Sequence, residues 1–526
     1  MEKRLLFVRL SLLVAIALLA AGQPAAADPT PPTLSQNETL DDTTANITDS
    51  LTALDLEVRE GYFQTWGIEQ CPPTFELMGT CYFNNPTAPY ILPAVPYWDD
   101  EFVDPATKGV FGQTPEGYGT TFRFDPHEAI LIFGYLPPPA HYFGLQTYTF
   151  SHKGKYDTNS ETYTFFSTFG GESAFFHEIP LNPKRIGFMN SLSDSINNVM
   201  IERQSGASWD QFRYFIITPD GHMERELRRA LDKLGVDDSE IFTQRIPENV
   251  RVGLQKNADD FLAPLRYSMP LDGGGADTPS DQWRHSPTLR VLRVRDTSPG
   301  YPKEPFPAWT LDSYEARTAE PEGYLRDDLT KLVYAVADAW EQPCEDEACA
   351  GRYRAFGDLQ SPPINLIGAL CSEIGMDCAG DGWDASYGFC PGITFDNGEV
   401  WAVIGTLGTA TGNATYSSVG VNNFRLRLGV KAADYPKLVG SAAPYEEFEG
   451  DPANLGKFFV YYFARECDDI EPLTHGYCME VESTPLALPE GDRAAFTERD
   501  YIKPGTQWGP DSAQLLPSRA LKLTRP

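Results

Sequence analysis

The chain has 526 residues, with 74 Asp and Glu against 42 Lys and Arg, which gives a net charge of −32 at pH 7. Such a surface repels phosphate backbones and anionic lipid, so it disfavours binding to nucleic acid and to a membrane surface. Aromatic residues make up 12% of the sequence, and its 44 Gly and 43 Pro indicate many short strands and turns rather than a helical bundle.

Residues 1–27 have the pattern of a secretory signal peptide. Basic residues precede the apolar run Leu10–Ala21, and Ala25–Ala27 offer a cleavage site. The apolar run is shorter than the roughly 20 residues that span a bilayer. We therefore predict a protein that is secreted, periplasmic or extracellular, with no membrane span in the mature chain.

The composition of the mature chain changes along its length. Residues 28–55 are rich in Thr, Pro, Asn and Asp, which predicts a disordered leader. Residues 56–295 are predicted to form an α+β domain, 296–312 a proline-rich connector, and 313–526 a second domain with a helix, strands and cysteine-rich turns. The predicted fold class is α+β and β-rich, with mostly antiparallel or mixed sheets, at least two amphipathic helices and stabilising disulfides.

Residues 129–150 contain two strand-like runs joined by Pro137–Pro139. Ile130–Phe133 are all apolar, as in a strand that is buried on both faces. Proline fixes φ and donates no backbone hydrogen bond, so a tight hairpin turn is excluded, and we predict a stiff bridge between two neighbouring strands of one sheet. His141 closes this bridge, where it could serve catalysis or form only an ordinary hydrogen bond.

A small polar cluster at residues 191–198 could present a nucleophile. Ser193 and Asp194 are its candidates, and together with His141 they are the catalytic candidates of the chain. The cluster lacks the G-x-S-x-G pattern that aims a serine above a sheet. The alternative is a turn or a helix start, where these residue types bond to the backbone.

Two segments have the apolar spacing of amphipathic helices. The first begins with Thr218 as N-cap and ends before Gly235, between two strand-like runs. The second spans Gly323–Gln342, and Pro343 ends it.

The nine cysteines fall in close groups, which in an exported chain favours local disulfides. Cys390 is left over by the simplest pairing. No C-x2-C pair is present, which argues against zinc. The simplest pairing joins Cys71 with Cys81, Cys344 with Cys349, Cys371 with Cys378, and Cys467 with Cys478.

One segment has the residue types of a cation site. Asp377, Asp381 and Asp384 lie close together among glycines and cysteines, and their carboxylates could supply oxygen ligands to calcium. The spacing is not that of an EF-hand, and an Asp/Gly turn held by a disulfide is the alternative. No other cofactor is indicated, because Gly405–Gly412 lacks the dinucleotide-binding pattern and is predicted to form a glycine-rich turn.

Several stretches are similar to a family of uncharacterised secreted proteins: LPPPAHYFGLQTY, DASYGFCPGITFDNGEVWAVIGTLGTATGNATY, VYYFAREC and DYIKPGTQWGPDS. The resemblance covers most of the mature chain and implies no catalytic residue, because the family has no established activity. Abundant aromatic residues and the lack of a catalytic motif favour a binding or surface-interaction protein for an extracellular ligand or surface. The alternative is an extracellular hydrolase of esters or glycans with an unrecognised Asp/Glu or Ser site.

Overall fold

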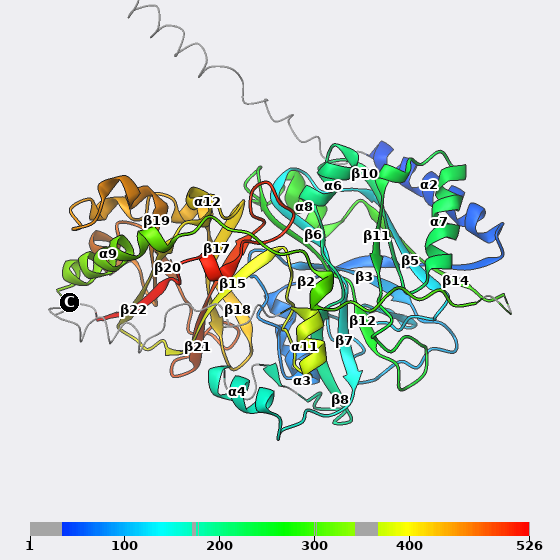
Figure 1. The fold of residues 1–526 in the computed structure, drawn as a ribbon, viewed down its shortest axis with the longest axis horizontal. Helices are drawn as coiled ribbons and strands as arrows, with labels where there is room; N and C mark the ends of the chain where they lie inside the picture. Colours follow the sequence, from blue (N-terminus) through cyan, green and yellow to red (C-terminus); the bar gives the residue numbers. More distant parts are fainter. Residues whose placement is uncertain are drawn as a thin grey trace, which may run out of the picture.

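The structure, a computed structural model, describes residues 34–170, 175–176, 178–298, 300, 302–341 and 367–524. Figure 1 shows an elongated arrangement, with the first half of the chain (to residue 298) at the right and most of the second half (from residue 302) at the left. The fold is α+β with mostly antiparallel and mixed sheets, which confirms the predicted fold class. Within the described ranges, no helix combines the length and apolar character needed to cross a membrane.

A five-stranded sheet lies at the far end of the first half. Its central strand carries Ile130–Phe133, all of them fully buried, because helices cover one of its faces and a second sheet covers the other. Only its last two strands pair in parallel, across helix α7 (Gly221–Lys233). In order across the sheet the strands are β1 (Leu56–Glu60), β14 (Leu289–Asp296), β5 (Glu128–Tyr135), β10 (Phe212–Thr218) and β11 (Ile241–Arg245).

Two further sheets complete the first half and face the second half. One contains β2 (Tyr62–Trp66), β3 (Tyr90–Pro96), β13 (Leu265–Pro270), β6 (Ala140–Leu145) and β9 (Ile196–Asn197) in that order, with β4 (Tyr118–Gly119) paired to β3. The other contains β12 (Asp260–Leu262), β7 (Tyr148–Lys153) and β8 (Arg185–Ser191).

The proline bridge differs from its prediction, because it joins strands of two different sheets. β5 pairs with β14 and β10, whereas β6 pairs with β13 and β9. The bridge cannot donate hydrogen bonds, but its carbonyls accept them from Asp210, Tyr267 and Leu271 of neighbouring segments. The bridge is therefore held as a crossing between two layers.

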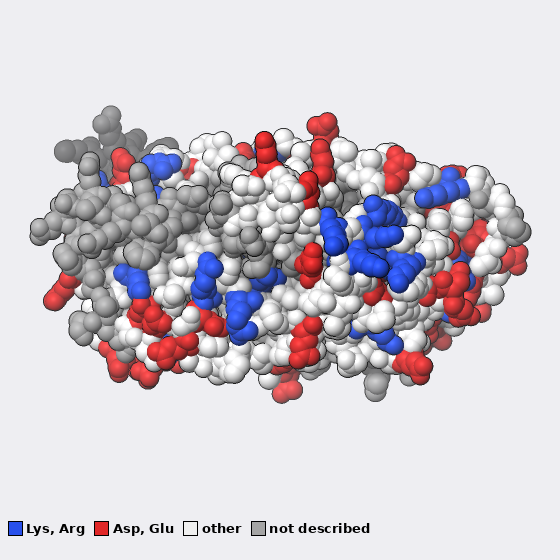
Figure 2. All heavy atoms as spheres, turned by 90° about the horizontal axis from the view of Figure 1, so that it is seen from below, with Lys and Arg blue, Asp and Glu red and all other residues white. Residues whose placement is uncertain are grey.

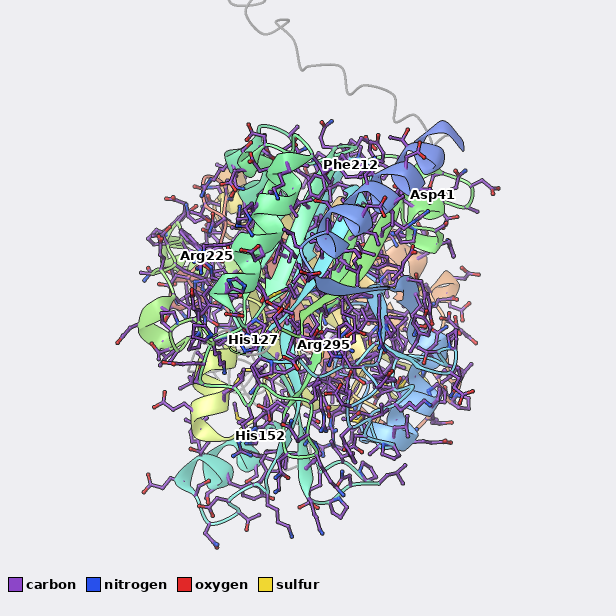
Figure 3. All side chains as sticks on the ribbon, turned by 90° about the vertical axis from the view of Figure 1, so that its right-hand side faces the viewer. Asp41, His127, His152, Phe212, Arg225 and Arg295 are labelled. Carbon is purple, nitrogen blue, oxygen red and sulfur yellow. A yellow bond between two sulfur atoms is a disulfide. The ribbon has the colours of Figure 1, made fainter. Side chains whose placement is uncertain are left out.

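The predicted disordered leader, residues 28–55, is corrected from Leu34 onward. Helix α2 (Leu34–Thr52) packs on the five-stranded sheet, and its Leu40, Ile47 and Leu51 are at most 1% exposed. Its Asp41 pairs with Arg290 of β14 at 2.6 Å, and Figure 3 shows α2 beside α7 on the outer face of that sheet. The polar composition concealed a narrow apolar stripe with helical spacing.

The second half contains two four-stranded sheets that pack face to face. The first has the order β15 (Ala385–Thr394), β21 (Arg493–Tyr501), β17 (Tyr416–Asn423) and β18 (Leu428–Asp434). The second has the order β20 (Cys478–Glu480), β19 (Phe458–Ala464), β16 (Glu399–Thr406) and β22 (Arg519–Thr524), and helix α9 (Arg326–Ala339) covers its outer face.

Helices form at both predicted amphipathic segments, with shifted ends. α7 is capped by Asp220 rather than Thr218, and α9 is three residues shorter at each end than the predicted helix. Glycine-rich residues 405–412 include the short helix α12 rather than a simple turn. The remaining helices are α3 (Cys71–Met78), α4 (Glu161–Gly170), α6 (Asn198–Ser205), α8 (Pro279–His285), α11 (Gly368–Ile374), α12 (Gly408–Thr411), α13 (Tyr435–Leu438) and α14 (Glu471–Thr474).

Three predicted disulfides are confirmed: Cys71–Cys81, Cys371–Cys378 and Cys467–Cys478. They are consistent with an oxidising compartment outside the cytoplasm. The predicted Cys344–Cys349 pair and signal peptide lie outside the described residues. Cys390 is buried in β15.

The two predicted domains share an apolar core. One cluster of buried side chains contains Trp66, Tyr90 and Tyr148 of the first half together with Val403 and Phe496 of the second half. The predicted domain limits therefore separate segments that pack against each other. Whether the two domains fold independently stays a prediction.

Candidate functional site

A cavity of about 140 Å³ lies where the two halves meet, and we call it the central cavity. The first half contributes residues from β3, β13 and the turn after α3. The second half contributes the loop 378–382 and strands β15 and β21. A cavity of roughly 150 Å³ in another protein core is large enough to hold benzene, so the central cavity has room for a small organic molecule.

The loop 378–382 forms one wall and has little freedom to move. Cys378 at its start is joined to Cys371 of α11, and Ala379 and Gly380 both have positive φ, 52° and 82°. A Cβ atom at Gly382 would lie 2.8 Å from Asp384 Oδ1 and 3.4 Å from Arg266 Nη2, so a larger residue there would have to displace the Asp384 carboxylate.

Arg266, on β13, is 6% exposed and lines the cavity. Its Nη2 donates to the Tyr148 hydroxyl at 2.5 Å, but its Nε has no hydrogen-bond partner. No carboxylate of the described residues lies within 4.0 Å of its guanidinium nitrogens. Because a guanidinium stays protonated, the cavity wall holds a buried positive charge that no carboxylate of the described residues contacts directly.

Arg499, on β21, is a second buried arginine without an ion pair to a carboxylate of the described residues. It is 4% exposed, and its hydrogen bonds go to neutral oxygens, to Thr497 Oγ1 at 2.9 Å and to the carbonyl of Phe83 at 3.0 Å. Arg317 also lines the cavity and is partly buried, and its guanidinium carbon lies 4.1 Å from the ring centre of Trp383. Burial lowers the pKa of Arg317 to about 10, so this side chain is still charged at pH 7.

Two of the three predicted metal ligands bind to donors of the protein itself. Asp381 accepts from the backbone and hydroxyl of Ser191 at 2.9 and 2.5 Å and from the backbone of Gly368 at 2.8 Å. Asp377 accepts from the backbone of Met189 and of Ala379 at 2.8 and 2.9 Å. These bonds tie the loop 378–382 to β8.

Asp384 is different, because its Oδ2 accepts from the Tyr142 hydroxyl at 2.8 Å while its Oδ1 has no partner. In the part of the chain that the structure describes, no three His, Cys, Asp or Glu side chains are placed to hold a metal ion. Calcium binding by Asp377, Asp381 and Asp384 stays a prediction.

Among the described residues, no hydrogen bond joins the side chain of one catalytic candidate to the side chain of another. His141 lies 3.1 Å from the Tyr435 hydroxyl of the second half, and burial lowers its pKa. Ser193 donates only to the carbonyl of Asp194, at 3.3 Å. Asp194 accepts from the indole of Trp508 at 3.2 Å, and burial raises its pKa to about 6. Hydrolysis through these residues stays a prediction.

The pKa values of several buried carboxyls give a testable pH dependence. Burial raises the pKa of Asp377 to about 7, of Asp381 to about 6 and of Glu128 to about 7. These groups bind protons more tightly in the folded state than in the unfolded state, so the free energy of unfolding falls as the pH rises from about 4 to 7. We expect a higher melting temperature at pH 5 than at pH 8, measured by differential scanning fluorimetry.

The variant Asp377→Asn is the control for this pH dependence, because it removes one of the titrating groups and keeps an oxygen that can accept from Met189. Its melting temperature should change less between pH 5 and pH 8 than that of the wild type. A wild-type melting temperature that rises over this interval would show that these carboxyls do not govern the dependence.

The sequence pointed to the loop 378–382 through its aspartates, but not to Arg266 or Arg499. Each arginine sits in a strand next to residues that face the opposite side, which is the ordinary pattern of a half-exposed strand. The sequence shows only that a polar residue stands at each of these two strand positions. It does not show that the other half of the chain covers them.

No protein-family model matches the chain, and no curated protein matches it. Two solved structures are similar to it: the VPA0106 protein of Vibrio parahaemolyticus, with 10% identity and a TM-score of 0.33 over 92% of this chain and 97% of that one, and an uncharacterised protein from Burkholderia cenocepacia, with 10% identity and a TM-score of 0.34 over 93% and 99%. Neither match brings an activity to this chain.

Proposed function

We propose that the protein is an extracellular binding protein that holds a small organic anion in the central cavity. The observation that carries the proposal is the burial of Arg266 and Arg499 without a carboxylate partner. An uncompensated buried charge destabilises a fold by several kcal/mol. A bound anion offsets this by supplying the missing negative charge.

The anion proposed is a carboxylate. Arginine binds planar carboxylates through two parallel N–H donors, which favours a carboxylate over other small anions beside Arg266. The cavity is also too small for a large polyanion, at about 140 Å³.

The rest of the ligand is apolar and compact. The walls around the arginines are largely aromatic, as in many small-molecule sites, and aromatic faces bind flat apolar groups well. The aromatic wall residues are Tyr82, Phe83, Tyr90, Phe175, Tyr387, Phe389 and Tyr501. A ring or a branched alkyl group of about the size of benzene matches this space.

The outer surface does not explain anion binding. Acidic and basic side chains are both spread over the face shown in Figure 2, with the densest group of Lys and Arg over the first half, and the whole chain has a net charge of −32. Such a field repels anions at long range. Affinity for an anion must therefore come from the buried arginines, and added salt, which screens the repulsion, should not weaken binding strongly.

Isothermal titration calorimetry with 3-phenylpropanoate and its neutral isostere 3-phenylpropanamide tests the proposal. We expect the carboxylate to bind at least about tenfold more tightly than the amide, because only the carboxylate neutralises the arginines. Benzoate and 3-methylbutanoate extend the series to smaller bodies. Equal affinities for acid and amide, or no binding by any of the acids, would contradict an anion site.

A further inference from the structure

We propose that a cluster of exposed cations on the first half, which we call the basic patch, binds a flexible acidic polysaccharide that carries sulfate or carboxylate groups. The patch is formed by the end of β7, the residue before β8 and the loop 251–257. None of its residues lines the central cavity. Its members are Lys153, Lys184, Arg251 and Lys256, and all four are exposed.

The end of β7 contacts the loop 251–257 directly. Lys153 Nζ donates to Asn257 Oδ1 at 2.7 Å, and Arg251 Nη1 donates to the carbonyl of Lys153 at 2.9 Å. Figure 3 shows His152, the residue before Lys153, in the lower part of the view, away from α2. Lys153 and Arg251 therefore lie side by side at that end of the first half.

The other two cations join the same area through backbone carbonyls. The backbone of Gly154 donates to the carbonyl of Lys184 at 3.1 Å. Arg185, which pairs with Lys153 in the sheet, donates from Nη1 to the carbonyl of Lys256 at 3.3 Å. All four positive charges are thus attached to neighbouring points of the backbone.

The basic patch has no anionic partner among the described residues. No carboxylate lies within 4.0 Å of its nitrogens, although the chain has 74 acidic residues for 42 basic ones. The buried carboxylates nearby already have partners: Asp259 lies 3.0 Å from His152 Nδ1, and Asp260 lies 2.7 Å from Arg123 Nε. Like charges that stand together repel each other, and an anionic polymer bound across them relieves that repulsion.

The acidic surface elsewhere does not prevent such binding. Figure 2 shows the densest group of Lys and Arg over this half of the molecule, although the net charge is −32. At physiological ionic strength, charges more than about 8 Å away are largely screened. A flexible polymer can contact the patch alone, whereas a nucleic-acid duplex, which is stiff over about 150 bp, extends over the acidic surroundings.

An acidic peptide is the alternative occupant, and extended peptides often bind by adding a strand to a sheet edge. Both outer strands of the sheet under the patch already make backbone contacts on their outer sides. Phe261 of β12 exchanges hydrogen bonds with Phe122 at 2.8 and 3.2 Å, and Met189 of β8 accepts from Gly380 at 2.8 Å. A polymer that binds through its charged groups alone fits this surface better. The disulfides are consistent with a compartment outside the cytoplasm, where acidic polysaccharides are such polymers.

The test is fluorescence anisotropy of a fluorescein-labelled heparin octasaccharide, titrated with the whole folded protein at pH 7.5. We expect saturable binding that weakens about tenfold or more between about 50 and about 200 mM NaCl, because each contact releases counter-ions. Unlabelled heparin should compete for the site. Neutral dextran should not, because it carries no charge.

Replacing all four patch residues by Gln should weaken heparin binding at least about tenfold. The matched control replaces four exposed cations that do have carboxylate partners, so that both variants have the same net charge. It should stay within about twofold of the wild type, because isolated ion pairs offer no free cluster of charge. The control changes are Arg225→Gln, Arg229→Gln, Arg425→Gln and Lys431→Gln.

Melting temperatures establish that both variants are folded. Should the fourfold patch variant fail to fold, Lys184→Gln and Lys256→Gln are tested singly, and each should weaken binding about twofold. Unchanged affinity in both single variants would contradict the proposal.

Three further outcomes would overturn it. Lack of heparin binding by the wild type would remove the site, and equal losses in the patch variant and the control would show that net charge alone governs binding. Tighter binding of poly-L-glutamate than of heparin would assign the patch to an acidic peptide. None of these outcomes affects the anion site of the central cavity, which is tested with 3-phenylpropanoate.

Discussion

Replacing Arg266 by Met should abolish the binding of 3-phenylpropanoate while leaving the ligand-free protein as stable as the wild type, or up to about 2 kcal/mol more stable. The expected sign is unusual for a buried polar residue. It follows because Arg266 forms no ion pair within 4.0 Å with a carboxylate of the described residues, so its removal breaks no direct ion pair. Met has a similar length, and the Tyr148 hydroxyl keeps its bond to the carbonyl of Asp381 at 2.8 Å.

Calorimetry measures the loss of binding, and urea unfolding measures the stability of the free protein. A loss of several kcal/mol in the free energy of unfolding would show that Arg266 serves the fold, and would remove the main support for the anion site. Retention of wild-type affinity by the Met variant would contradict the site directly.

Replacing Arg293 by Met should lower the free energy of unfolding by about 3–5 kcal/mol. Arg293 is buried, as Arg266 is, but it pairs with two buried carboxylates, Glu101 at 2.6 Å and Glu128 at 2.5 Å. Removal of the guanidinium leaves both carboxylates buried without a counter-ion. The same substitution therefore has opposite consequences at the two arginines.

Urea unfolding at pH 7.5 checks the expectation for Arg293, and the Arg266 variant serves as its control. The loss should be smaller at pH 5, because burial already raises the pKa of Glu128 to about 7 and its protonation relieves the stranded charge. A loss below about 1 kcal/mol at pH 7.5 would mean that the Glu101–Arg293–Glu128 cluster relaxes into solvent.

Local patterns predicted local features of this fold. Close cysteine spacing gave three disulfide pairs, and the run Ile130–Phe133 gave a strand buried on both faces. Both depend on residues near one another in the chain. The prediction that the strand after Pro137–Pro139 lies in the same sheet as β5 was wrong. Strand pairing depends on contacts with distant segments, here β13 for β6 and β14 for β5.

The cavity could not be predicted for the same reason. In β13, Leu265 and Tyr267 face the core of the first half, and Arg266 between them has the position of a solvent-facing residue. It is buried only because β15, β21 and the loop 378–382 pack over that face. The aspartates near the loop could be recognised in the sequence. Their hydrogen-bond partners could not, because those partners come from distant parts of the chain.

The most direct measurement is a crystal structure of the protein grown with 3-phenylpropanoate. We expect the ligand in the central cavity, with its carboxylate within hydrogen-bonding distance of the Arg266 guanidinium and its ring against the aromatic walls. A carboxylate bound elsewhere, or a ring in the cavity with its carboxylate turned away from Arg266 and Arg499, would contradict the account.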